Sequence, residues 1–228
     1  MNKKYWATIL CSPSNLKELT VGHLLSEGLL KSIKEVAEIN LKEEEASCYV
    51  KLRTGINAEN RLNLSRLHSR VIRSACGSSS PYQYSKKPQK VDSILKVKAE
   101  IIFNSVKQLN FKAELFRKTG VHVAAIYRDG GDIVALAEDV GRHNAVDKVI
   151  GITTMKHFVF DDCFLTSSGR LSGDIVSKAA KVGLPIVASL SAALDSGIRM
   201  AELANLTLIG FVRGRRMNIY TCPERILR

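Results

Sequence analysis

The sequence of 228 residues contains no long apolar run and few aromatic residues. No stretch approaches the 18 consecutive apolar residues of a membrane-spanning helix, and too few apolar residues follow the basic N-terminus for a signal peptide. We therefore expect no membrane insertion and a cytoplasmic location. Aromatic residues make up only 6%, and no recognition motif for nucleic acid occurs, so nucleic acid is not an expected partner.

The cysteines also lack the patterns of disulfide frameworks and zinc sites. They are Cys11, Cys48, Cys76, Cys163 and Cys222. Five widely spaced cysteines, an odd number, do not form a disulfide framework in a chain without an export signal. Because no Cys-x-x-Cys pair occurs, we expect no structural zinc and no other metal site. We expect at most one or two reactive thiols.

Positive charge is what the chain has in excess. Its 34 Lys and Arg against 22 Asp and Glu give a formal net charge of +12, which attracts anions. Charge alone leaves as candidate anions nucleic acid, which the low aromatic content disfavours, an anionic membrane surface, a phosphorylated cofactor and an acidic protein. Hydrophobic residues make up 45% and charged residues 25%, as in an ordinary globular protein.

The N-terminal part indicates a small α+β unit. Asn15 with Glu18 three residues later resembles a capping box at a helix start. Alternating apolar residues over 37–41 and 46–52 predict a β-hairpin. Residues 54–90 are basic and weakly periodic, with small residues, Gly and Pro, and predict a long loop. We expect a smaller portion over 1–90 and an α/β domain over 91–228.

In the second part, strands alternate with helices. Helices are expected over 91–109, 144–154, 172–182 and 195–204, with a shorter one around Leu115 and Phe116. Strands are expected over 121–127, 133–137, 163–166, 184–189 and 206–212, the first two as a hairpin. This order predicts βαβ crossovers and an α/β fold with a parallel or mixed sheet.

Four loops that follow these strands carry Ser, Gly or Arg. Ligands of open α/β sheets bind at the carboxyl ends of the strands, where helix N-termini and arginines attract phosphate. The candidate binding residues are Glu138, Asp139, Gly141, Arg142, His143, Asn144, Ser167, Ser168, Gly169, Arg170, Ser189, Ser191, Arg213 and Arg215. Neither the Walker pattern nor G-x-G-x-x-G occurs, so the usual ATP and NAD sites are not supported.

Simpler interpretations of these residues also exist. The serines at 167, 168 and 172 would then only cap a helix. Arg215 and Arg216 would form a solvated turn, and His143 would be a polar cap residue. Asp147 and Lys148 would be surface charges on a helix. Four such loops at one sheet edge favour a binding site over these alternatives.

Cys76 is the candidate nucleophile, because it lies in the polar loop after Arg70 and Arg73. Nearby cations favour the thiolate, which is the reactive form of a cysteine. The alternative is an incidental surface thiol. Cysteine proteases need a positioned base, and nothing in the sequence connects His68 or His143 to Cys76. Persulfide carriage needs only a nucleophilic thiol and is therefore the simpler chemistry.

Several motifs together resemble the formate dehydrogenase accessory sulfurtransferases, the FdhD family. They are TVGHLLSEG at 20–28, ACG at 75–77, EDVGRHNAVDK at 138–148, SSGR at 167–170 and GFVRGR at 210–215. The likeness covers residues 8–226. It implies a three-layer fold with a mixed sheet similar to cytidine deaminases, and a possible homodimer. It also implies that Cys76 carries persulfide sulfur from a cysteine desulfurase to a molybdenum or tungsten guanine dinucleotide cofactor for formate dehydrogenase or a related enzyme.

Two departures from related patterns bear on the chemistry. Zinc deaminases need His-x-Glu and Pro-Cys-x-x-Cys, whereas His122 is followed by Val123 and Ala124, which disfavours zinc hydrolysis. Many family members have Cys-x-x-Cys in the loop, where this chain keeps only Cys76. The alternative function is therefore a non-catalytic binder that delivers the dinucleotide cofactor to its target enzyme.

Overall fold

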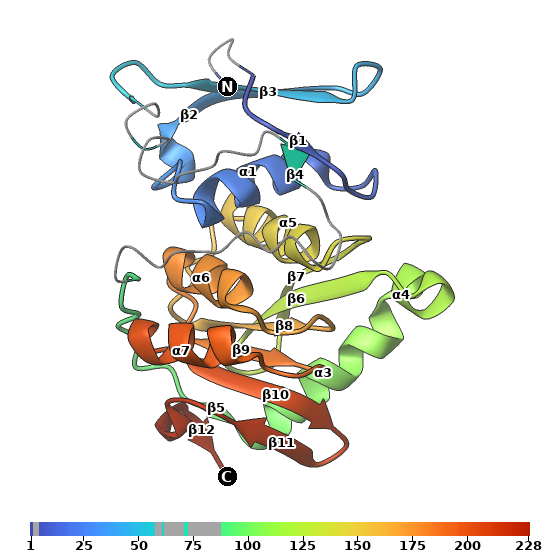
Figure 1. Ribbon diagram of the computed structural model, residues 1–228, viewed down its shortest axis with the longest axis vertical. Coiled ribbons are helices and arrows are strands. Elements are labelled where there is room, and N and C mark those ends of the chain that lie inside the picture. Colours follow the sequence, from blue (N-terminus) through green and yellow to red (C-terminus); the bar gives the residue numbers. More distant parts are fainter. Residues whose placement is uncertain (2–4, 58–60, 62–70, 73–87) are drawn as a thin grey trace.

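The computed structural model describes residues 1, 5–57, 61, 71–72 and 88–228, and for 71–72 only the backbone. Its centre is a six-stranded sheet in the order β11-β10-β9-β8-β6-β7 (Figure 1). The strands are β6 (His122–Arg128), β7 (Ile133–Asp139), β8 (Cys163–Ser167), β9 (Ile186–Ser189), β10 (Thr207–Arg213) and β11 (Arg216–Ile219). β8, β9 and β10 are parallel, and β6 is antiparallel to both β7 and β8. The mixed α/β sheet is therefore confirmed, while the likeness to cytidine deaminases stays a prediction.

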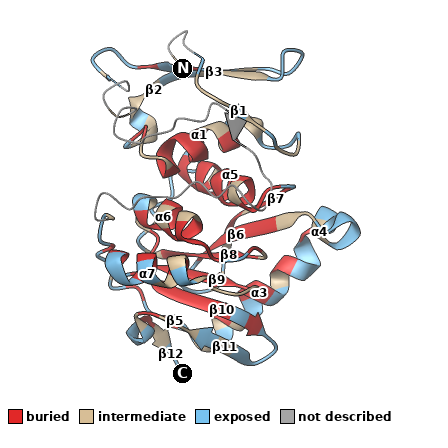
Figure 2. Ribbon diagram, viewed as in Figure 1, coloured by how far each residue is buried: buried red, intermediate tan, exposed pale blue. Residues whose placement is uncertain are grey.

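Helices cover both faces of this sheet, which explains why its central strands are mostly apolar. The helices are α1 (Leu16–Ser26), α3 (Ala99–Lys112), α4 (Glu114–Thr119), α5 (Arg142–Met155), α6 (Gly173–Val182) and α7 (Asp195–Ala204). One hydrophobic core joins the sheet to α1, α5, α6 and α7, and a second joins its other face to α3. Every residue of β8 and β9 is buried, as expected for strands covered on both faces (Figure 2).

The N-terminal part contributes short elements outside the sheet. The hairpin of β2 (Val36–Lys42) and β3 (Ser47–Leu52) is antiparallel, as predicted. It is preceded by the 3₁₀ turn η1 (Ile33–Glu35). β1 (Thr8–Ile9) pairs in parallel with β4 (Val71–Ile72). Near the C-terminus, the turn η2 (Pro223–Arg225) leads into β12 (Ile226–Leu227), which pairs in parallel with β5 (Val97–Lys98). No helix in the described ranges is long and apolar enough to cross a membrane.

Two predictions about helix starts were wrong in detail. The helix expected from Val91 begins at Ala99, because the backbone before it bonds to other segments: Val91 N–H donates to Ala204 O (2.8 Å). Val91 and Leu95 are buried, so their spacing imitated a helical face. Asn15 does precede α1, but its φ of 52° is left-handed and its side chain caps nothing, so no capping box forms.

Helices α1 and α5 approach closely at two glycines. A Cβ added to Gly22 on α1 would overlap the carbonyl oxygen of Asp147, and one added to Gly151 on α5 would overlap the carbonyl oxygen of Glu18. Because backbone atoms cannot move aside as a side-chain tip can, only glycine permits this approach. The contact joins the N-terminal part to the helix that follows β7.

Replacing Gly22 with alanine should therefore separate the two helices. We expect Gly22→Ala to lower the free energy of unfolding by about 3 kcal/mol, measured by urea denaturation, although alanine favours helices. Gly130→Ala is the matched control, since the nearest atom its Cβ would meet is Asp132 Oδ2 at 4.0 Å. Equal stability of the two variants would contradict the close approach.

Candidate functional site

The carboxyl ends of four strands meet at one edge of the sheet, which we call the carboxyl edge. β7 runs in the same direction as β8, because both are antiparallel to β6, and β9 and β10 run parallel to β8. The loops after β7, β8, β9 and β10 therefore share this edge, as the strand order in the sequence predicted. Three of the loops begin helices α5, α6 and α7, whose N-terminal N–H groups favour anions.

Hydrogen bonds connect the end of β9 and the loop after it to the loop after β8 and to β10. The Ser189 hydroxyl donates to Ser167 O (2.9 Å) and lies 2.6 Å from Gly169 O. Phe211 N–H donates to Ser191 O (2.9 Å), although the φ of Phe211 is 52°, an unfavourable value for a bulky residue. The loops thus form one connected surface.

The loop after β7 joins this surface through Arg142. A Cβ on Gly169 would lie 2.8 Å from Arg142 Cβ, so the two residues are in direct contact and only glycine fits. Burial and the charges of Arg142 and Arg170 lower the pKa of His122, which begins β6 at the same edge. Sequence reasoning did not assign His122 to the site. The antiparallel direction of the first hairpin strand was the signal that could have placed it there.

Several predicted binding residues have internal partners. Glu138 Oε1 accepts a hydrogen bond from Phe116 N–H, and the Ser168 hydroxyl oxygen accepts one from Val123 N–H (3.0 Å). The Ser167 hydroxyl oxygen accepts one from Gly169 N–H (3.0 Å). Asp139 and Asn144 are buried and bonded to each other, with Asn144 Nδ2 donating to Asp139 Oδ1 (2.9 Å). These side chains shape the loops.

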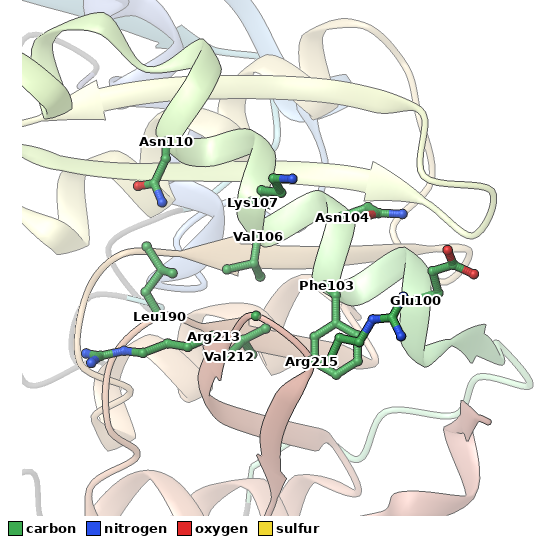
Figure 3. A pocket seen from close by; sticks show the side chains of 11 residues that line it. Glu100, Phe103, Asn104, Val106, Lys107, Asn110, Leu190, Val212, Arg213 and Arg215 are labelled. Atoms are coloured by element: carbon green, nitrogen blue, oxygen red, sulfur yellow. The ribbon is translucent and has the colours of Figure 1, made fainter.

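Arg213 and Arg215 instead line a groove of about 620 Å³. It lies between the end of β10 and helix α3, which contributes Phe103, Asn104 and Lys107 (Figure 3). Figure 3 shows the two arginines extending in different directions from the β10–β11 turn. Three cationic side chains and one acidic side chain, Glu100, line the groove, so it favours an anion. The α3 residues were not predicted.

Two polar groups near the starts of α5 and α6 have no hydrogen-bond partner among the described residues. The Ser172 hydroxyl, at the N-terminus of α6, is buried without a hydrogen bond. His143 Nε2, in the first turn of α5, is also buried without one. His143 Nε2 lies 3.9 Å from Asp174 Oδ2, too far for a hydrogen bond. Burial, the main cause, and the positive charges of Lys178 and Arg142 lower the pKa of His143 to about 4. At pH 7 this contact is therefore not an ion pair.

Two buried ionic clusters lie behind the carboxyl edge. In the first, Lys178 Nζ contacts Asp147 Oδ2 (3.0 Å) and Glu27 Oε1 (2.7 Å). Asp147 also accepts from the Ser26 hydroxyl (2.7 Å) and contacts His23 Nδ1 (3.2 Å). The second is the pair of Lys148 Nζ and Asp139 Oδ2 at 2.7 Å. Asp147 and Lys148 are 2% and 0% exposed, so their interpretation as surface charges was wrong.

The cysteines divide into those the structure describes and Cys76, which lies outside the described residues. Cys163 is buried, and burial raises the pKa of its thiol to about 12. Cys11, Cys48 and Cys222 are half-buried. Among the described residues, no three His, Cys, Asp or Glu side chains come together as a possible metal site.

Comparison with known proteins decides the family. The model of the FdhD/NarQ family matches residues 1–227. The chain belongs to the FdhD/NarQ family. Sulfur carrier protein FdhD of Saccharolobus solfataricus is 39% identical over 224 residues, covering 97% of this chain and 83% of that protein. Sulfur carrier protein FdhD of Bacillus subtilis is 35% identical over 230 residues, covering 99% and 86%.

A solved structure supports the fold of this FdhD/NarQ-family chain. This is the crystal structure of a candidate formate dehydrogenase accessory protein from Desulfotalea psychrophila. The two chains superpose with a TM-score of 0.74 at 24% identity, over 98% of this chain and 87% of the other. At that identity the likeness concerns the fold.

The lowered pKa of His143 predicts how this FdhD/NarQ-family protein responds to acid. Between pH 6.5 and 4, His143 is protonated in the unfolded chain but not in the folded chain. The free energy of unfolding therefore decreases as the pH is lowered through this range. We expect His143 to contribute about 2–3 kcal/mol to this loss by pH 4.5. Urea denaturation at pH 7 and 4.5 should show a smaller loss in His143→Gln. An equal loss in both proteins would mean that the folded protein protonates His143 normally.

Proposed function

We propose that the chain is a sulfur carrier of formate dehydrogenase maturation. In this proposal Cys76 passes persulfide sulfur from a cysteine desulfurase to a molybdenum or tungsten guanine dinucleotide cofactor. The observation that supports it best is the cationic carboxyl edge and its adjoining groove, in a chain whose relatives are named sulfur carriers. The reaction class is sulfur transfer with a cysteine persulfide intermediate.

The residues present suit a large anion with several phosphates. Arg170 and the N-termini of α5 and α6 supply positive charge at the carboxyl edge, and Arg213 and Arg215 supply it at the groove. The Ser172 hydroxyl and His143 Nε2 are buried polar groups that a bound ligand would satisfy. In this assignment the ligand meets His143, Arg170, Ser191, Arg213 and Arg215, while Glu138, Asp139 and Asn144 support the loops.

The sulfur chemistry needs one thiolate and no metal bound by the chain. The Cys76 thiolate attacks the outer sulfur of the desulfurase persulfide, an S–S bond forms, and the desulfurase thiolate leaves. In the second transfer a two-electron-reduced acceptor supplies the electron pair for its new bond to the outer sulfur of the Cys76 persulfide, the S–S bond breaks, and Cys76 leaves as a thiolate. The preceding Arg70 and Arg73 favour that anionic form.

A second candidate function is delivery of the dinucleotide cofactor without sulfur chemistry. The sequence Cys76-Gly77-Ser78-Ser79 favours it, because a mechanism with a resolving thiol would need a second cysteine in this loop. The two candidates share the binding site and differ only in the role of Cys76. A test of the thiol therefore separates them.

Persulfide formation is that test. After incubation with a cysteine desulfurase and cysteine, intact-protein mass spectrometry should show a gain of one sulfur. We expect the gain to disappear in Cys76→Ala and to persist in the control Cys48→Ala, which removes a half-buried thiol of the hairpin. No gain in the folded wild type beside an active desulfurase would leave cofactor delivery as the function.

Binding of GDP tests the ligand half of the proposal. The variant Arg213→Ala/Arg215→Ala should bind GDP at least about tenfold more weakly by calorimetry, since each charge-assisted hydrogen bond contributes about 1.5–3 kcal/mol. Arg128→Ala is the matched control, because this half-exposed arginine lies at the opposite end of β6 from the carboxyl edge. Equal losses in both variants would indicate only a general attraction to positive charge.

A further inference from the structure

Strand β10 has an irregularity at Phe211, close to its carboxyl end. β10 pairs regularly with β11 as far as Gly210, which lies opposite Asn218. The pairing resumes at Arg213, which lies opposite Arg216. β10 therefore has one residue more than β11 over this stretch, which is the definition of a β-bulge. We call residues 210–213 the β10 bulge.

The β10 bulge keeps a large apolar side chain out of the hydrophobic core. Side chains of a regular strand alternate between its two faces. Ile209 belongs to the core between the sheet and α3, so regular alternation would bring residue 211 to the same core. Val212 takes that place instead and is buried, whereas Phe211 is 42% exposed. A phenylalanine ring that the core would accept is thus held partly in solvent.

The backbone of Phe211 is strained as well. Its φ of 52° lies in the left-handed region, which disfavours a bulky residue and leaves glycine unstrained. The loop after β9 maintains this conformation: Phe211 N–H donates to Ser191 O (2.9 Å), and a Cβ added to Gly210 would lie 3.2 Å from the same oxygen. Because strained residues of this kind cluster at functional sites, the strain and the exposure of Phe211 together indicate a function.

The β10 bulge lies beside the cationic groups of the groove. Residues 212–215, which follow Phe211 directly, line the groove shown in Figure 3. A phenyl ring offers no hydrogen bond to a phosphate, but its face suits the flat face of another ring. The arginines at 213 and 215 and the ring at 211 therefore match two different parts of one ligand, its phosphates and a planar ring.

We propose that Phe211 is the stacking platform for the purine ring of a nucleotide, whose phosphates bind the arginines of the same turn. This inference rests on the proposed function, because it concerns the same ligand. It assigns a binding role to a residue outside the predicted set. The aromatic side chain of Phe211 selects a phosphorylated heterocycle over phosphate alone, since stacking adds affinity that charge does not supply.

Two probes separate the ring from the phosphates, because GDP carries both and pyrophosphate carries only the charge. Phe211→Leu keeps an apolar side chain but removes the ring. By calorimetry it should bind GDP at least about fivefold more weakly than wild type, and pyrophosphate with unchanged affinity. Phe158→Leu is the matched control, since Phe158 is 40% exposed and lies beyond the C-terminal end of α5, at the opposite edge of the sheet. Arg213→Ala/Arg215→Ala should weaken the binding of both probes.

The variant Phe211→Trp reports the contact directly. The chain has one tryptophan, so in a Trp6→Phe background the introduced indole is the only one. Its fluorescence should be quenched by GDP and not by pyrophosphate, and the variant should keep the GDP affinity of its background, because an indole also stacks on a purine.

A comparison of Phe211→Gly with Phe211→Ala tests the strained backbone. Both variants lack the ring, so both should lose GDP affinity as Phe211→Leu does. The glycine variant should have a melting temperature about 2–4 °C above that of the alanine variant, since only alanine is strained at this φ. Equal melting temperatures would contradict the left-handed conformation on which the inference depends.

The outcomes separate this inference from the proposed function. Unchanged GDP affinity in Phe211→Leu, with binding weakened in the arginine variant, would overturn the stacking role and leave the anion site in place. Equal losses of GDP and pyrophosphate affinity in Phe211→Leu would also overturn it, because the side chain would then only support the arginines. If the wild type takes up no sulfur, the sulfur-carrier function fails, while the binding of the two probes still decides the inference.

Discussion

Two buried lysines hold the N-terminal part of the chain against the sheet. Lys178 on α6 meets Asp147 on α5 and Glu27 at the end of α1. Lys148 on α5 meets Asp139 and the backbone at Ser12. A buried ammonium group without its carboxylates would cost several kcal/mol, so each lysine requires the segments around it to be in place. The pKa of Asp147 lies well below its usual range, chiefly because Lys178 opposes the effect of burial, so this cluster stays ionic at neutral pH.

The same arrangement explains the form of the carboxyl edge. Because Asp139, Asn144, Asp147 and Lys148 are buried, His143 is the residue of the motif at 138–148 that meets the ligand in the proposed function. The edge then depends on neighbouring loops for more donors, and the hydroxyl of Ser189 fixes those loops to each other.

The sequence predicted five of the six strands of the sheet because they are largely buried and mostly apolar, and it missed β11, whose residues alternate between exposed and half-buried. It failed at Val91, where buried residues at helical spacing belong to an extended segment bonded to Ala204. The alternative interpretation of Asp147 and Lys148 as surface charges also failed. Charged residues on a helix are usually solvated, and the local sequence does not reveal that Ser12, His23 and Ser26, more than a hundred residues away, pack around them. The edge loops were predictable from strand order, whereas the α3 side of the groove was not, because Asn104 and Lys107 resemble any exposed helical residues.

The pairing of β5 with β12 cannot form during synthesis until the end of the chain has been made. Val97 lies beside Ile226, so the strand that leads into α3 has its partner only after more than a hundred further residues have been made. Closing so long a loop is slow compared with forming local helices and hairpins. The core between α3 and the sheet contains Phe164 of β8, Ile186 of β9 and Ile209 of β10, so it too is completed only after these later strands have been made, and until then the apolar residues of α3 lack part of their cover.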